Sequence, residues 1–141
     1  MVDLLNFVEN VKNALEDDEV KKSYVGFYDF PRGACMDASI LLGILLGRQG
    51  FGDFDLVSAS YDRERFFTHA WLENQNYLID ITVEQFSDWP KQSHIINLTS
   101  ASERYNYFEI IFREPLIHHN NVPDLGFYAA LSLVEEKIRT A

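Results

Sequence analysis

The apolar run at residues 40–46, Ile-Leu-Leu-Gly-Ile-Leu-Leu, constrains the fold more than any other stretch of the chain. Pro31 and Gly33 interrupt regular structure just before it, so we expect a helix to begin near Ala34. Because this helix would be apolar on most of its sides, it must be buried at the centre of the fold. Cys35, the only cysteine of the chain, would then lie in its first turn.

The predicted position of Cys35 is one that favours a nucleophile. The first turn of a helix presents backbone N–H groups without helical partners and the positive end of the helix dipole, and both favour a thiolate over a thiol. A single cysteine forms no internal disulfide, which is typical of a reducing compartment. A lone cysteine can also be a small buried hydrophobe, so the assignment depends on the partners that the rest of the chain supplies.

Composition narrows the classes of function. The 141 residues, 47% hydrophobic and 14% aromatic, predict one compact domain over residues 1–141. A formal charge of −10 argues against nucleic acids and anionic membranes as partners, since both are bound mainly by Lys and Arg. The longest apolar run is far shorter than a bilayer span, and the first residues lack the pattern of a signal peptide. We therefore expect a cytoplasmic protein; its oligomeric state is left open.

Hydrophobic periodicity predicts helices at both ends and in the middle of the chain. Leu4, Val8, Val11 and Leu15 recur at helical spacing after a possible cap at Asp3. The charged segment that follows, residues 16–22, is expected to be a solvated helix end or linker, and residues 23–30 a loop against the core. Gly47 and Gly50 are expected to stop the central helix, and residues 124–139 to form a closing helix.

From residue 54 onward the pattern alternates, which predicts strands. Residues 54–60, 65–72 and 76–81 indicate an antiparallel meander, and residues 94–98 and 105–112 are further strand candidates. Thr82 has the spacing of a capping box and is expected to start a short helix. Helices together with an antiparallel sheet define an α+β fold.

The second hairpin of the meander predicts a histidine–aspartate pair. Either a two-residue loop at 74–75 or a four-residue loop at 73–76 sets His69 directly opposite Asp80. Opposed side chains on one face of a sheet have Cβ atoms about 4.5–5.5 Å apart. The Asp80 carboxylate could then accept a hydrogen bond from the His69 ring, whereas a three-residue loop would break the pair. Taken singly, His69 could be a satisfied histidine of the sheet, and Asp80 a helix or turn cap for the Thr82 segment.

Cys35, His69 and Asp80 supply the three roles of nucleophilic acyl transfer. The thiolate attacks a carbonyl, the imidazole carries the proton to the leaving group, and the carboxylate orients the imidazole. The backbone N–H of Cys35 would hold part of the developing oxyanion, and Tyr28 is a candidate second donor. Trp71 shares a face with His69 and is either a core residue or a wall of the substrate pocket.

Three sequence blocks resemble those of the transglutaminase-like proteins, which share the core of the papain-like cysteine peptidases. They are Gly-Ala-Cys at residues 33–35, Thr-His-Ala-Trp-Leu-Glu at 68–73 and Tyr-Leu-Ile-Asp-Ile-Thr at 77–82. Met36 stands where the family carries an aromatic residue. The resemblance covers roughly residues 30–90 and implies a single transglutaminase-like domain, with the Cys35 helix packed on an antiparallel sheet that carries His69 and Asp80.

No metal or cofactor is expected. His94, His118 and His119 invite a zinc interpretation, but adjacent histidines point apart and no cysteine or carboxylate stands at zinc-ligand spacing around them. The chain also has no glycine-rich loop for phosphate.

These observations predict a cysteine-dependent acyl-transfer enzyme that acts on amide bonds of a peptide or protein substrate through a Cys–His–Asp triad. Hydrolysis, by a peptidase, amidase or deamidase, is favoured over cross-linking because a small domain has little surface for two large substrates. The alternative is a binding or immunity-type module that keeps the scaffold without using the thiol. Such a module would present an acidic face to a basic partner.

Overall fold

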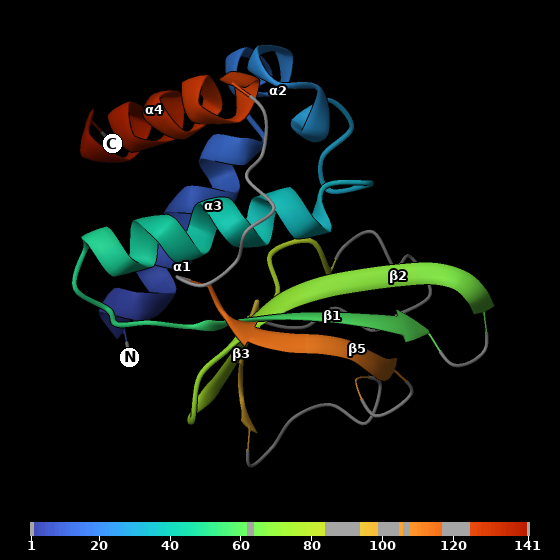
Figure 1. Ribbon diagram of the computed structural model, residues 1–141. Coiled ribbons are helices and arrows are strands. Elements are labelled where there is room, and N and C mark those ends of the chain that lie inside the picture. The colour runs from blue at the N-terminus through green and yellow to red at the C-terminus, as the bar shows by residue number, and fades with distance from the viewer. Residues whose placement is uncertain are drawn as a thin grey trace.

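The computed structural model describes residues 2–61, 64–83, 94–98, 105, 108–116 and 125–140. These residues form two layers, with the helices on one side and the sheet on the other (Figure 1). The architecture is α+β, as the sequence predicts. Among the described residues, no helix has the length and apolar character needed to cross a membrane.

The helical layer is arranged around one buried helix, α3. Eight of its residues are buried, and Leu41, Leu42 and Leu46 have no exposed surface. The layer comprises α1 (Val2–Leu15), α2 (Asp18–Ser23), the short 3-10 turn η1 (Val25–Phe27), α3 (Cys35–Arg48) and α4 (Leu125–Thr140). The central buried helix that begins at the cysteine is therefore confirmed.

The acidic segment after α1 is more ordered than its charge predicts. Helix α1 begins before the expected cap, with Asp3 inside its first turn. The side chain of Asp17 then accepts the backbone N–H of Glu19 at 2.9 Å and caps a separate helix, α2. The expectation of a helix end or linker over this stretch is wrong, because Val20 gives α2 a buried anchor in the core.

The end of α3 also differs from the prediction. Gly47 lies inside the helix, which continues to Arg48, whereas Gly50 has the left-handed φ of +81° that terminates helices. The backbone N–H of Gln49 and that of Phe51 still bond back to the carbonyls of the last turn. Gly47 is itself exposed, and the cost of about 1 kcal/mol for a glycine in a helix is offset by the buried residues of the preceding turns.

The sheet is antiparallel throughout, with the strand order β4-β3-β2-β1-β5 over the described residues. Its strands are β1 (Asp55–Tyr61), β2 (Glu64–Glu73), β3 (Tyr77–Ile79), β4 (Ile95–Asn97) and β5 (Phe108–Pro115). The predicted meander is confirmed as β1-β2-β3. The strand expected over 105–112 begins later, at Phe108, and the short helix expected after Thr82 falls mainly outside the described residues.

The β2–β3 hairpin has a different register from the one predicted. Leu72 pairs with Ile79, and the backbone N–H of Asn74 donates to the carbonyl of Tyr77 at 3.0 Å. The two-residue turn is therefore 75–76 and not 74–75, and the ladder is displaced by two residues from the expected one.

The side chain of Asn74 explains this displacement. Its Oδ1 accepts the backbone N–H groups of Asn76 and Tyr77, at 2.8 and 2.7 Å, which folds the turn around Asn74. His69 and Asp80 are consequently not directly opposed. A shift of two residues nevertheless keeps every side chain on its expected face, because the side-chain period of a strand is two.

Two apolar clusters lie on opposite faces of the sheet. The larger joins the sheet to the helices through Leu56, Leu72 and Ile79. The smaller uses the alternate strand positions and includes Trp71 and Leu78, with Val57, Ala59, Val83, Tyr105 and Phe108. His69, two residues before Trp71, and Asp80, two residues after Leu78, therefore belong to the second face.

Burial of α3 predicts where a core truncation costs most. Leu41→Ala should lower the free energy of unfolding by about 2–5 kcal/mol, because Leu41 is fully buried and the truncation leaves a cavity. Leu5→Ala is the control, since Leu5 is 36% exposed on α1, and it should cost about 0.5 kcal/mol or less. Urea denaturation followed by circular dichroism measures both, and equal losses would contradict the central position of α3.

Candidate active site

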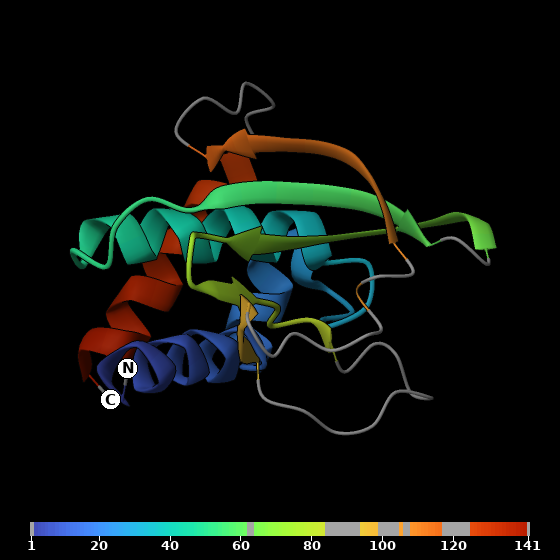
Figure 2. The same ribbon diagram turned by 90° about the horizontal axis from the view of Figure 1, so that it is seen from below.

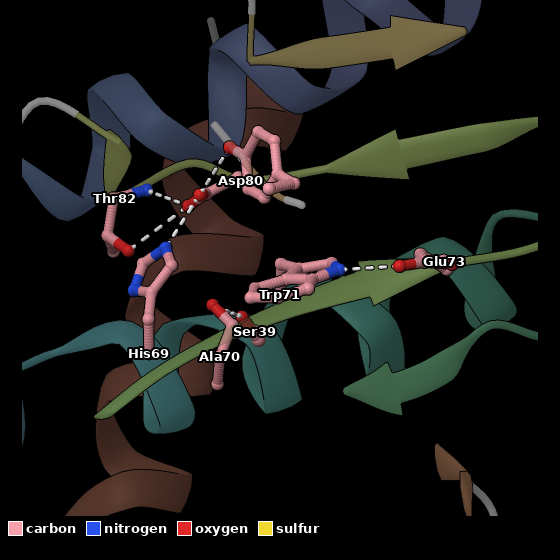
Figure 3. Close-up of polar contacts among 8 residues, drawn as sticks. Ser39, His69, Ala70, Trp71, Glu73, Asp80 and Thr82 are labelled. Atoms are coloured by element: carbon pink, nitrogen blue, oxygen red, sulfur yellow. Dashed lines mark hydrogen bonds and ion pairs between the residues drawn. The ribbon is translucent and has the colours of Figure 1, made fainter. Parts of the chain in front are cut away.

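A buried hydrogen bond joins His69 to Asp80. His69 Nε2 donates to Asp80 Oδ2 at 2.6 Å, and the two side chains are 0% and 1% exposed (Figure 3). The predicted contact is thus confirmed although the predicted register is wrong. Continuing the observed register would place Asp80 across from Trp71, so His69 reaches it diagonally, and diagonal neighbours on one face of a sheet are within reach of long side chains.

Both oxygens of the Asp80 carboxylate accept hydrogen bonds. Oδ2 also accepts the hydroxyl of Tyr105 at 2.7 Å, and Oδ1 accepts the backbone N–H and the hydroxyl of Thr82 at 3.1 and 3.3 Å. Burial alone raises the pKa of Asp80, but the charge of His69 and these hydrogen bonds outweigh it and hold that pKa below the ordinary value of 3.8. Asp80 is therefore an anion at neutral pH.

His69 carries the matching positive charge. Burial alone lowers the pKa of His69, but the negative charge and hydrogen bond of Asp80, with smaller contributions from Cys35, raise it from 6.5 to about 9. At neutral pH the ring is then protonated at both nitrogens. In Figure 3, Nε2 of the ring faces Asp80 and the second nitrogen, Nδ1, lies on the side of the ring away from it.

Helix α3 brings Cys35 to this ring. Cys35 is the first residue of the helix and is half-buried. Ser39 lies one turn further along the same face, and its hydroxyl contacts the carbonyl oxygen of Ala70, next to His69, at 3.5 Å (Figure 3). Cys35 is close enough to His69 to contribute to the raised pKa of the ring, and Nε2 is the ring nitrogen that bonds to Asp80.

The short β2–β3 ladder explains how a helix on one face meets a histidine on the other. Within residues 64–83, all of which are described, the pairing of these strands stops at Leu72 and Ile79. Strand β3 does not pair with β2 at His69. The edge of β2 at His69 is thus not covered by β3, and Ser39 of α3 contacts the next residue of β2, Ala70.

Trp71 lies beside the pair and is a core residue by its burial. Its ring centre is 5.7 Å from that of His69, and the side chain is 2% exposed. Its indole N–H donates to Glu73 at 2.7 Å, and Glu73 in turn accepts a hydrogen bond from Arg113 at 2.7 Å. Of the two interpretations of Trp71, core residue or pocket wall, the structure favours the first.

Tyr28 lies at the end of η1, and its side chain is 68% exposed. Its contribution as an oxyanion donor stays a prediction. The backbone N–H of Cys35 is the first of helix α3 and has no acceptor within the helix. This N–H group therefore lies at the start of the helix, as the sequence predicts, and its role as an oxyanion donor stays a prediction.

The bonds from Thr82 to Asp80 agree with the interpretation of Asp80 as a cap for the Thr82 segment, and they exist beside the bond to His69. Sequence reasoning missed Tyr105, which lies 25 residues away and whose contact depends on tertiary packing. Of the histidines considered for metal binding, His94 bonds to Glu9, and His118 and His119 lie outside the described residues.

No model of a protein family, curated protein or solved structure matches the chain. The interpretation of the site therefore depends on its geometry and on the three sequence blocks that contain Cys35, His69 and Asp80.

The charge state of His69 can be measured directly. Titration of its ring by NMR should give a pKa of about 9, and Asp80→Asn should move that pKa downward, because burial then acts without an opposing charge. Protonation of His69 favours the folded state, so its contribution is complete below pH 6.5 and is lost as the pH rises through about 9. The contribution of Asp80, whose pKa is lowered, is complete above pH 3.8 and is lost as the pH falls below it. A wild-type ring that titrates at or below 6.5 would contradict the buried ion pair.

Proposed function

We propose that the chain is a cysteine-dependent acyl-transfer enzyme acting on amide bonds of peptides or proteins through Cys35, His69 and Asp80. The observation that carries this proposal is the buried hydrogen bond of 2.6 Å between His69 Nε2 and Asp80 Oδ2, on a ring whose raised pKa also reflects Cys35 in the first turn of α3. The resemblance to the transglutaminase-like and papain-like proteins supports the same assignment of roles. It also supports the corresponding fold.

In the first half of the reaction the ion pair supplies both the nucleophile and the acid. A protonated imidazole beside Cys35 stabilises the thiolate by charge. The sulfur attacks the carbonyl carbon, and the electron pair of the C=O double bond moves to oxygen, which the backbone N–H of Cys35 can bind. His69 then gives its Nδ1 proton to the amide nitrogen, the C–N bond breaks and an amine leaves, so that a thioester remains on Cys35.

In the second half, neutral His69 acts as the base. It takes a proton from water, whose oxygen attacks the thioester carbon, and the C–S bond breaks to release a carboxylic acid. A primary amine in place of water would give a new amide. Asp80 stabilises the imidazolium that is formed again at this step and keeps the ring in one orientation.

Hydrolysis is the favoured outcome, for a peptidase, amidase or deamidase. A chain of 141 residues offers little surface on which to hold two large substrates at once. A cytoplasmic location would keep the single cysteine reduced.

Replacing the nucleophile tests the proposal. Cys35→Ser should abolish release of amine or ammonia from a glutamine-containing peptide or from denatured casein, because an unactivated hydroxyl is a far poorer nucleophile than a thiolate. Circular dichroism should show an unchanged fold. Substantial turnover by the folded variant would remove Cys35 from the mechanism, and parallel assays with methylamine separate hydrolysis from transfer.

The binding-module alternative makes a different prediction for the wild-type thiol. Iodoacetamide should alkylate a catalytic Cys35 rapidly well below pH 8, and His69→Gln should slow that reaction. An inert wild-type thiol would favour the non-catalytic module.

Asp80→Asn should lower kcat by about 10- to 1,000-fold, equivalent to about 1.4–4 kcal/mol, with little change in KM. The amide cannot stabilise the imidazolium and can select the wrong tautomer of His69. Asp17→Asn is the matched control, because Asp17 caps α2 away from the site and asparagine caps equally well. A lower melting temperature with unchanged kcat in Asp80→Asn would make Asp80 a structural cap for Thr82 instead.

A further inference from the structure

A second histidine–carboxylate pair connects the sheet to helix α1. His94, the residue before β4, is 7% exposed, and its Nδ1 lies 2.5 Å from Oε1 of Glu9 on α1. The Glu9 side chain is 37% exposed. Figure 2 shows the short gold strand β4 beside the blue helix α1, in agreement with this bond.

The same histidine holds the backbone of Asp80. Asp80 follows Ile79, the last residue of β3 that pairs with β2. Its backbone N–H donates instead to the carbonyl of His94 at 2.8 Å, which continues the β3–β4 ladder beyond the Ile79–Ile95 pair. The backbone of Asp80 is therefore held in place by the residue before β4 and not by β2.

Strand β4 can hold the backbone of Asp80 only if β4 itself is fixed to the rest of the fold. It has three residues and lies at the edge of the sheet, so its ladder with β3 is short. A hydrogen bond that involves a charged carboxylate is stronger than a neutral one, and the imidazole of His94 is shielded from water. The bond to Glu9 ties this end of β4 to a helix that packs in the main core.

We propose that Glu9 and His94 are positioning residues for Asp80, which set the geometry at which its carboxylate meets His69. The inference deepens the proposed function, because it gives helix α1 a role in the reaction at Cys35. The connection has three hydrogen bonds: Glu9 to His94, the His94 carbonyl to the Asp80 N–H, and Asp80 to His69. A displacement of about 1 Å along such a connection can cost about 100-fold in rate.

Glu9→Gln in the full chain tests this inference. The variant should move the NMR titration of His69 downward and slow the alkylation of Cys35 by iodoacetamide at neutral pH by about tenfold or more, because a displaced Asp80 stabilises the imidazolium less. The melting temperature should change little, since Glu9 is partly exposed. His94→Gln should have the same effect on His69, and the double variant should be no worse than either single one.

Glu16→Gln is the matched control. It removes the same charge close to the same helix, and Glu16 pairs with Lys12 at 2.9 Å, away from β4. Both readouts should stay at their wild-type values in this variant.

An unchanged His69 titration in folded Glu9→Gln would overturn the inference, whether or not the melting temperature falls. Additive effects in the double variant would also overturn it, because they would mean that Glu9 and His94 act separately. If iodoacetamide alkylated wild-type Cys35 no faster than it alkylates glutathione, the proposed function would be contradicted. The inference about Glu9 and His94 would still be testable, because the His69 titration reports the position of Asp80 without any substrate.

Discussion

The ion pair between His69 and Asp80 is the interaction on which the rest of the site depends. Two charges removed from water cost several kcal/mol each unless their remaining polar atoms are also satisfied. Here Thr82 and Tyr105 satisfy the carboxylate from two different parts of the chain. Among the described residues, no buried polar side-chain atom lacks a partner. Such a network holds one geometry, which a reaction centre requires.

The fold supplies this geometry with few elements. Helix α3 is buried along most of its length, so its first turn, and Cys35 with it, is held in a fixed position beside β2. The β2–β3 ladder is short enough for Asp80 to leave it and bond to His94. His69 and Asp80 thus lie just beyond the point where β2 stops pairing with β3, while His69 still pairs with Ala59 of β1.

The features that follow from hydrophobic periodicity could be predicted from the sequence. The buried helix after Cys35 and the meander through His69 are of this kind, because the burial of apolar side chains determines both. The pairing of His69 with Asp80 was predicted for a reason that is only partly correct. The face of each strand followed from its alternation, but the register depended on how the side chain of Asn74 folds its turn.

The features that the sequence did not predict depend on polar contacts, which leave no trace in the hydrophobic periodicity. The cap at Asp17 creates α2 within a segment whose charge indicates solvent. The Tyr105 hydroxyl and the Glu9–His94 bond join residues far apart in the chain, and neither has a local signal. The Tyr105 hydroxyl bonds to Asp80, and His94 bonds to its backbone, so the surroundings of Asp80 were less predictable than its contact with His69.

Detection of an acyl-enzyme would show whether Cys35 is the nucleophile and whether His69 activates it. The wild-type protein is mixed with p-nitrophenyl acetate, quenched in acid and digested, and the acetylated peptides are identified by mass spectrometry. If His69 and Asp80 activate Cys35, one acetyl group should appear on Cys35 at least about ten times faster than in His69→Gln and then disappear as the thioester is hydrolysed. Acetylation of Cys35 at the same rate in both proteins would contradict activation of the thiol by His69.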